Sequence, residues 1–62
     1  MIQYRIVLFA HDGRELSSGY QYSSDDENAC ASAERLMLST PQAGSVKVLA
    51  GERVVCAYER AA

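Results

Sequence analysis

The sequence has no tryptophan, one histidine, one proline and only two cysteines, Cys30 and Cys56. Two cysteines are too few for the disulfide framework of a small secreted domain. No spacing motif links His11 to either cysteine, which disfavours a zinc site with its three or four protein ligands. We therefore expect no metal or other cofactor, and two buried thiols in a reducing compartment. A helix-to-sheet disulfide is the alternative for the cysteines.

Basic residues and long apolar runs are scarce as well. Six Lys and Arg against eight Asp and Glu give a formal net charge of −2, which disfavours binding to a phosphate backbone. The longest apolar stretch, residues 6–10, is too short to cross a bilayer. The first five residues also lack the basic start of a signal peptide. The sequence thus predicts a cytoplasmic protein with neither a membrane nor a nucleic-acid partner.

The remaining composition predicts one small globular domain, residues 1–62. Hydrophobic residues make up 48% of the chain and charged residues 23%, which are ordinary values for a folded protein. A chain of this length buries only about 60% of the surface that its unfolded form exposes. Small domains commonly add disulfides, a metal or oligomerisation to such a thin core. Together with an uncovered apolar face, described below, this thin core leads us to expect a homo-oligomer, most simply a dimer.

The first third of the chain predicts a β-hairpin. Apolar residues alternate over 2–10, and again at period two after Asp12 and Gly13. A two-residue turn would divide the apolar side chains between the two faces, whereas a three-residue loop over 11–13 collects them on one. We favour the three-residue loop for this reason. It places seven side chains under the helix: Ile2, Tyr4, Ile6, Leu8, Leu16, Tyr20 and Tyr22.

The middle of the chain predicts one helix over 25–38. Ser24 and Glu27 have the spacing of a capping box, and acids in the first turn suit the helix dipole. Pro41 disfavours helical geometry at the residue before it, so the helix ends earlier. The predicted inner face consists of Ala29, Cys30, Ala33, Leu36 and Met37.

The last third predicts a second hairpin around Gly51, with strands over 46–49 and 53–58. Gly51 either opens a two-residue turn with Glu52 or closes a three-residue loop over 49–51. The two turns exchange which of Val54 and Val55 shares a face with Val48. We favour the loop, which turns Val55 outward. The fold class is therefore α+β, a four-stranded mainly antiparallel sheet with one helix on one face, in the order β-β-α-β-β. The spatial order of the strands stays open.

Three segments carry the turns and the helix start of this pattern: YRIVLFAHDGR at 4–14, DDENA at 25–29 and VKVLAGERVV at 46–55. With them the chain resembles a group of short uncharacterised bacterial proteins familiar from alphaproteobacteria. That group often has Trp-Asp-Gly at the second turn, where this chain has Leu49, Ala50 and Gly51. The resemblance implies the architecture and no activity.

One face of the predicted sheet has no element of the chain to cover it. It carries the candidate interface residues Val7, Phe9, Leu49 and Val55. An exposed apolar patch on a small domain is typical of an association surface. The leading hypothesis is therefore a non-catalytic protein-interaction module that self-associates through this face.

Two other functions remain as alternatives. The acidic cluster Asp25, Asp26, Glu27 and Glu34 would suit a phage or mobile-element type of inhibitor, such as an anti-CRISPR-like protein, that binds a nucleic-acid enzyme. Strand tyrosines are also typical of single-strand nucleic-acid binders, but most of them are predicted to lie under the helix. An enzyme is disfavoured, because His11 lies in a turn and no nucleophile elbow or phosphate-binding loop is present.

Overall fold

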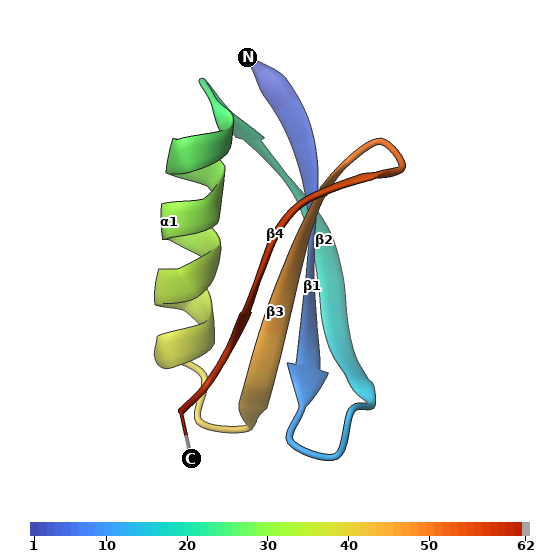
Figure 1. The fold of residues 1–62 in the computed structure, drawn as a ribbon, viewed down its shortest axis with the longest axis vertical. Coiled ribbons are helices and arrows are strands. Elements are labelled where there is room, and N and C mark those ends of the chain that lie inside the picture. The colour runs from blue at the N-terminus through green and yellow to red at the C-terminus, as the bar shows by residue number, and fades with distance from the viewer. Residues whose placement is uncertain (62) are drawn as a thin grey trace.

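The computed structural model describes residues 1–61 and consists of one antiparallel sheet with one helix along one of its faces (Figure 1). Its elements are β1 (Ile2–Ala10), β2 (Glu15–Ser23), α1 (Asp26–Leu38), β3 (Ala43–Ala50) and β4 (Arg53–Glu59). The predicted α+β class and the β-β-α-β-β order are confirmed.

The strands lie in the order β2-β1-β3-β4, so β1 and β3 are central and β2 and β4 form the edges. Both β2 and β3 are antiparallel to β1 and hence parallel to each other, with β1 between them. A parallel connection needs a crossover, and α1 supplies it. The helix therefore covers one face and leaves the other without a covering element among residues 1–61.

The hairpin of β1 and β2 turns as predicted, but its register then slips. The Ala10 amide donates to the Arg14 carbonyl at 2.7 Å, and Gly13 adopts a φ of +93°, as the three-residue loop requires. Two residues further on, a bulge leaves Leu16 without a partner on β1. The register shifts between Leu8 and Phe9, so that Phe9 lies opposite Glu15 while Leu8 lies opposite Ser17.

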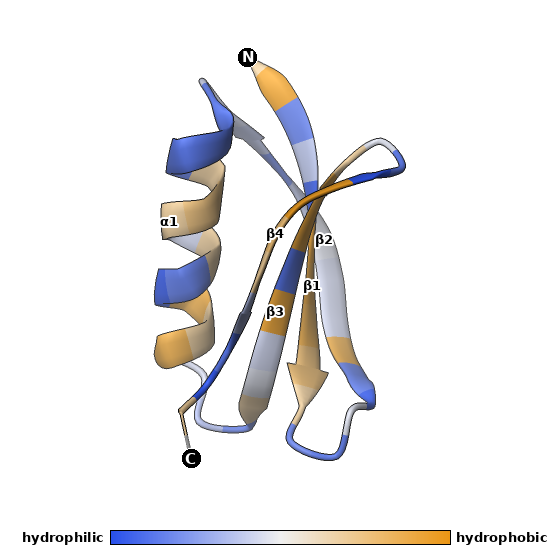
Figure 2. Ribbon diagram, viewed as in Figure 1, coloured by the Kyte–Doolittle hydropathy of each residue, from blue (hydrophilic) through white to orange (hydrophobic). Residues whose placement is uncertain are grey.

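The bulge transfers the apolar side of β2 to the opposite face of the sheet. Tyr20 pairs with Arg5 rather than Tyr4, and Tyr22 lies opposite Gln3. The prediction that Leu16, Tyr20 and Tyr22 lie under the helix is therefore wrong, because a one-residue shift exchanges the two faces of a strand. Small or polar residues face the helix from β2 instead: Ser17, Gly19, Gln21 and Ser23. Figure 2 shows β2 pale along most of its length.

The core lies between α1 and the two central strands. Its buried members are Tyr4, Ile6, Leu8, Ala29, Ala33, Met37, Ala43, Val46 and Val48. Alanine at two inner positions of α1 lets the helix backbone approach the sheet closely. The predicted inner face of the helix is confirmed except for Leu36, which is 43% exposed. Leu36 points toward β2, whose small side chains do not cover it.

The helix begins one residue later than predicted. Its N-cap is Asp25, whose carboxylate accepts from the Asn28 amide at 2.8 Å. Ser24 is therefore not the cap. Its hydroxyl instead accepts a hydrogen bond from the Asn28 side chain at 2.8 Å.

The second hairpin has the two-residue turn, so the three-residue loop is wrong. Ala50 pairs with Arg53, and Gly51 has a φ of +62°, while among residues 1–61 no residue other than glycine has a positive φ. This suits a type II′ turn, in which the first central residue is glycine. A bulge then makes Val55 the extra residue of β4, so that Val48 lies opposite Cys56.

This second bulge brings the cysteines together. Cys56 faces the helix, and its Cα lies 6.4 Å from that of Cys30, to which it is joined by a disulfide. The separation is within the range that a disulfide spans. The prediction of two thiols is corrected: the helix-to-sheet disulfide forms because the bulge at Val55 turns Cys56 toward α1.

The residue after β4 secures the end of the helix. The Arg60 side chain donates to the Ala43 carbonyl at 2.9 Å, to the Thr40 carbonyl at 3.0 Å and to the Met37 carbonyl. These acceptors include a carbonyl of the last helical turn, which has no partner within the helix. One guanidinium thereby joins α1, the connection to β3 and the end of the chain.

We expect Arg60→Met to lower the free energy of unfolding by about 2 kcal/mol, because it removes partly buried hydrogen bonds to a charged group. Arg14→Met is the matched control, since the Arg14 ion pair with Asp12 is largely exposed and worth less than about 1 kcal/mol. Urea unfolding followed by circular dichroism measures both. Equal losses from the two variants would contradict the anchoring role of Arg60.

Candidate interaction surface

The outer face of the sheet, opposite α1, has no covering element among residues 1–61. The strand pairings assign to it Gln3, Arg5, Val7, Phe9, Glu15, Ser18, Tyr20, Tyr22, Ser45, Lys47, Leu49, Val54, Ala57 and Glu59. We use the name outer face for this set below.

Three of the four candidate interface residues lie on the outer face. Phe9 and Leu49 are half-buried, and Val7 is 4% exposed because neighbouring side chains cover it. Val55 does not belong to the set, because it packs against the core on the helix side. Val54 takes the outward position beside Leu49 and is 52% exposed.

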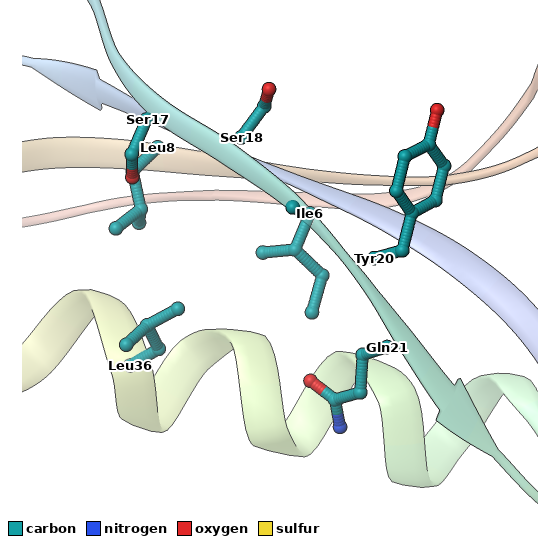
Figure 3. A pocket seen from close by; sticks show the side chains of 8 residues that line it. Ile6, Leu8, Ser17, Ser18, Tyr20, Gln21 and Leu36 are labelled. Atoms are coloured by element: carbon teal, nitrogen blue, oxygen red, sulfur yellow. The ribbon is translucent and has the colours of Figure 1, made fainter.

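Two tyrosines that the sequence placed in the core dominate this face. Tyr20 and Tyr22 are 70% and 63% exposed. Figure 3 shows the side chains of Tyr20 and Ser18 directed away from α1, while Gln21 and Ile6 point toward it. No feature of the β2 sequence marks the bulge at Leu16, so alternation alone could not find these residues.

The charges of the outer face balance. Arg5 lies in the row of Tyr20, and Lys47 lies in the next row, with Val7 and Ser18. The Lys47 ammonium lies 5.7 Å from the centroid of the Phe9 ring. Glu15 and Glu59 flank Phe9 and Ser45 in the row nearest the first turn. The face thus carries two cations and two anions at separate positions along the strands.

The acidic cluster does not form a shared patch. Asp25 caps the helix, and Asp26 accepts a hydrogen bond from the Tyr4 hydroxyl at 2.6 Å and forms an ion pair with Arg53 at 3.4 Å. Glu27 and Glu34 are exposed. Two of the four carboxylates therefore serve the fold, which weakens the case for an acidic docking site.

The contact between Tyr4 and Asp26 shifts both groups. The hydrogen bond to Asp26, the burial of the ring and the nearby negative charge raise the pKa of Tyr4 to about 12. The hydrogen bond from Tyr4 and the positive charge of Arg53 lower the pKa of Asp26. The hydrogen bond thus links the sheet to the first turn of α1 as long as Tyr4 is neutral and Asp26 is charged.

These shifts predict a stability that declines at both pH extremes. The raised pKa of Tyr4 stabilises the fold fully below pH 10, and this contribution is lost as pH rises from 10 to about 12. The lowered pKa of Asp26 stabilises the fold above about pH 4, and this contribution is lost as the pH falls below that value. Urea unfolding of the wild type, Tyr4→Phe and Tyr20→Phe from pH 8 to 11.5 measures the alkaline arm. We expect Tyr4→Phe alone to flatten it; an unchanged slope would contradict the assignment.

Two hollows elsewhere on the molecule are less suited to a ligand. The groove between β2 and α1, lined by Ile6, Leu8, Gly19 and Leu36 among others, has a volume of about 220 Å³ (Figure 3). Sites for small molecules are commonly about 300–1,000 Å³, a range that the first hollow does not reach and the second, of about 320 Å³, only just enters. The second hollow contains His11, whose Nε2 lies 3.1 Å from the Pro41 carbonyl oxygen, and Arg60, which is engaged as described above.

Within residues 1–61 no group of three or more His, Cys, Asp or Glu side chains is arranged to hold a metal ion. The helix in the same range, α1, falls short of the length and apolarity that a bilayer-spanning segment needs.

Comparison of the chain with protein-family models, curated proteins and solved structures finds no match.

Proposed function

We propose that the protein is a non-catalytic interaction module that forms a homodimer by packing its outer face against that of a second copy. The observation that carries the proposal is the exposure of Tyr20, Tyr22 and Val54 beside the half-buried Phe9 and Leu49 on a face without a covering helix. Apolar patches of this kind mark association surfaces. Burial of the face would also supplement the thin core of a small domain.

The charge pattern favours a second copy as the occupant. In a two-fold dimer with antiparallel strands, the row of Glu15 and Glu59 in one copy lies over the row of Gln3 and Tyr22 in the other, next to Arg5. The two cations and two anions leave the face without a net charge, so a second copy is not repelled by it.

The size of the face is adequate for a dimer. Strands about 4.8 Å apart that rise about 3.3 Å per residue give four strands of seven residues a footprint of roughly 450 Å². Two copies would cover roughly 900 Å² on a flat estimate, close to the ~1,000 Å² that a specific interface needs. The protruding rings of Tyr20 and Tyr22 add to this area.

Sedimentation equilibrium at high micromolar concentration tests the proposal. We expect the wild type to have twice the chain mass of 6.8 kDa and Tyr20→Asp and Phe9→Asp to be monomers, because each places an unpaired charge in the apolar part of the interface. Circular dichroism checks that the variants are folded. Leu38→Asp is the matched control, since Leu38 is 57% exposed on the helix, and it should remain a dimer. A monomeric wild type, or a dimer that only Leu38→Asp disrupts, would contradict the proposal.

The same face supports a second candidate, a single-strand nucleic-acid binder. The corrected register places Tyr20 and Tyr22 two residues apart on one open face, with Arg5 directly opposite Tyr20. Base stacking on an exposed aromatic ring contributes about 1–3 kcal/mol per base. The net charge of −2 opposes it, which makes the dimer the first proposal. Fluorescence anisotropy with a labelled oligothymidine distinguishes them: salt-sensitive binding abolished by Tyr20→Ala would favour the second candidate, and no binding would reject it.

We place the protein in the cytoplasm of a bacterium as part of this proposal. The resemblance to short bacterial proteins supports it. Disulfides are rare in the cytosol, and those that form there are usually transient or redox-sensing, so the proposal requires the bond between Cys30 and Cys56 to be of that kind.

A further inference from the structure

The edge strand β4 has three side-chain connections to the helix and to the connection that follows it. At its start, Arg53 forms the ion pair with Asp26; in the middle, Cys56 forms the disulfide with Cys30; beyond its end, Arg60 binds backbone carbonyls. The side chains of Arg53 and Asp26 are 63% and 44% exposed, so their attraction is weak. Between the two ends, the disulfide is the covalent link that holds β4 to α1.

The disulfide lies where the strand pairing is interrupted. Val55, the residue before Cys56, is the extra residue of the bulge, and a bulge locally disrupts the ladder of hydrogen bonds. Cys56 is half-buried, whereas Cys30 is buried, so we expect a reductant to reach the bond from the side of Cys56, at the edge of the sheet. The link is thus placed at the weakest point of β4 and near solvent.

The residues beside Cys56 on β4 belong to the outer face. Val54 lies opposite Leu49, and Ala57 lies opposite Lys47. Displacement of β4 would therefore remove one side of the proposed interface, while Tyr20 and Tyr22 on the far edge would keep their positions. The two edges of the sheet differ in this respect, since β2 is not attached by a disulfide.

We infer that the Cys30–Cys56 disulfide is a redox-operated clamp on β4 and, through β4, on self-association; the second part rests on the proposed function. A dithiol reductant acts by thiolate attack on one sulfur of the disulfide, which gives a mixed disulfide and one cysteine thiol. Its second thiolate then displaces the remaining cysteine. Two electrons and two protons pass to Cys30 and Cys56, and the reductant becomes a disulfide. With the clamp open, β4 separates locally from α1 and the dimer weakens.

Amide hydrogen exchange followed by mass spectrometry tests the clamp in the wild type with and without dithiothreitol. We expect exchange of the amides of residues 53–59 to accelerate on reduction by at least about tenfold more than exchange of residues 15–23, the other edge, which follows only the global loss of stability. Cys30→Ser should reproduce the reduced state and lose its response to dithiothreitol. Sedimentation of the same samples should show a dimer dissociation constant raised by about tenfold or more.

A destabilised variant with its disulfide intact separates the clamp from a general loss of stability. Val46→Ala, in the core, should accelerate exchange in β2 and β4 alike. If reduction accelerates amide exchange equally in β2 and β4, or leaves exchange in β4 unchanged, the clamp hypothesis is wrong. A selective response of β4 in a protein that is monomeric in both redox states supports the clamp and contradicts the self-association proposal.

Discussion

Tyr4→Ala is expected to leave the protein largely unfolded at 25 °C. Tyr4 has no exposed surface, is among the largest fully buried side chains, and lies on the central strand β1. Truncation of a buried aromatic side chain costs about 3–5 kcal/mol. A domain of this size has a total stability of roughly 3–9 kcal/mol, so the loss removes most of it. Far-ultraviolet circular dichroism and urea unfolding measure the effect.

Two further variants divide this loss into its parts. Tyr4→Phe keeps the ring in the core and removes the hydrogen bond to Asp26, for an expected cost of about 1.5–3 kcal/mol. Tyr22→Ala, on the outer face, should change the stability of the monomer by less than about 0.5 kcal/mol. If Tyr22→Ala were as damaging as Tyr4→Ala under monomeric conditions, the register of β1 and β2 described here would be wrong.

Removal of the disulfide by Cys30→Ala with Cys56→Ala is expected to lower the free energy of unfolding by about 3.5 kcal/mol. The bond closes a loop with a sequence separation of 26 residues, and the loss of loop-closure entropy in the unfolded chain accounts for a value of this size. For a domain of this length the melting temperature should fall by about 15–25 °C. Differential scanning calorimetry of the oxidised wild type and the double variant compares them directly.

Reductant provides the internal control for this result. Dithiothreitol should bring the wild type close to the double variant and leave the double variant unaffected. Intact mass spectrometry should show the oxidised wild type about two daltons lighter than the reduced form, as two hydrogens are lost per disulfide. A wild type whose melting temperature does not respond to complete reduction would contradict a stabilising role of the bond.

These expectations describe a domain with few sources of stability. The core holds one large aromatic residue, the side of β2 facing the helix carries small polar residues, and the helix is packed through alanines. The disulfide, the Arg60 anchor and the proposed dimer interface all add stability outside the core. In this protein an interaction surface and a redox-active bond would therefore affect both association and folding.

Local features were predictable because they depend on neighbouring residues. The alternation of residues 2–10 indicated β1, the acids and Pro41 bounded α1, and Gly13 and Gly51 marked the two turns. The three-residue loop of the first hairpin was predicted because it collects the apolar side chains on one face. The loop forms, with Gly13 at a positive φ, but the bulge at Leu16 moves Tyr20 and Tyr22 to the other face. The predicted N-cap of the helix was wrong by one residue, since Ser24 and Asp25 are both suitable caps and the sequence does not decide between them.

By itself, the sequence determined the number, type and order of the elements, because period and turn chemistry act over a few residues. The tertiary structure alone decided which side of β2 and β4 faces the helix. Each choice depends on a single extra residue, Leu16 in one hairpin and Val55 in the other. A bulge exchanges the faces of a strand for reasons of packing that no local pattern records. Those two residues expose Tyr20 and Tyr22 and bring Cys56 to Cys30, so the candidate surface and its disulfide both follow from packing.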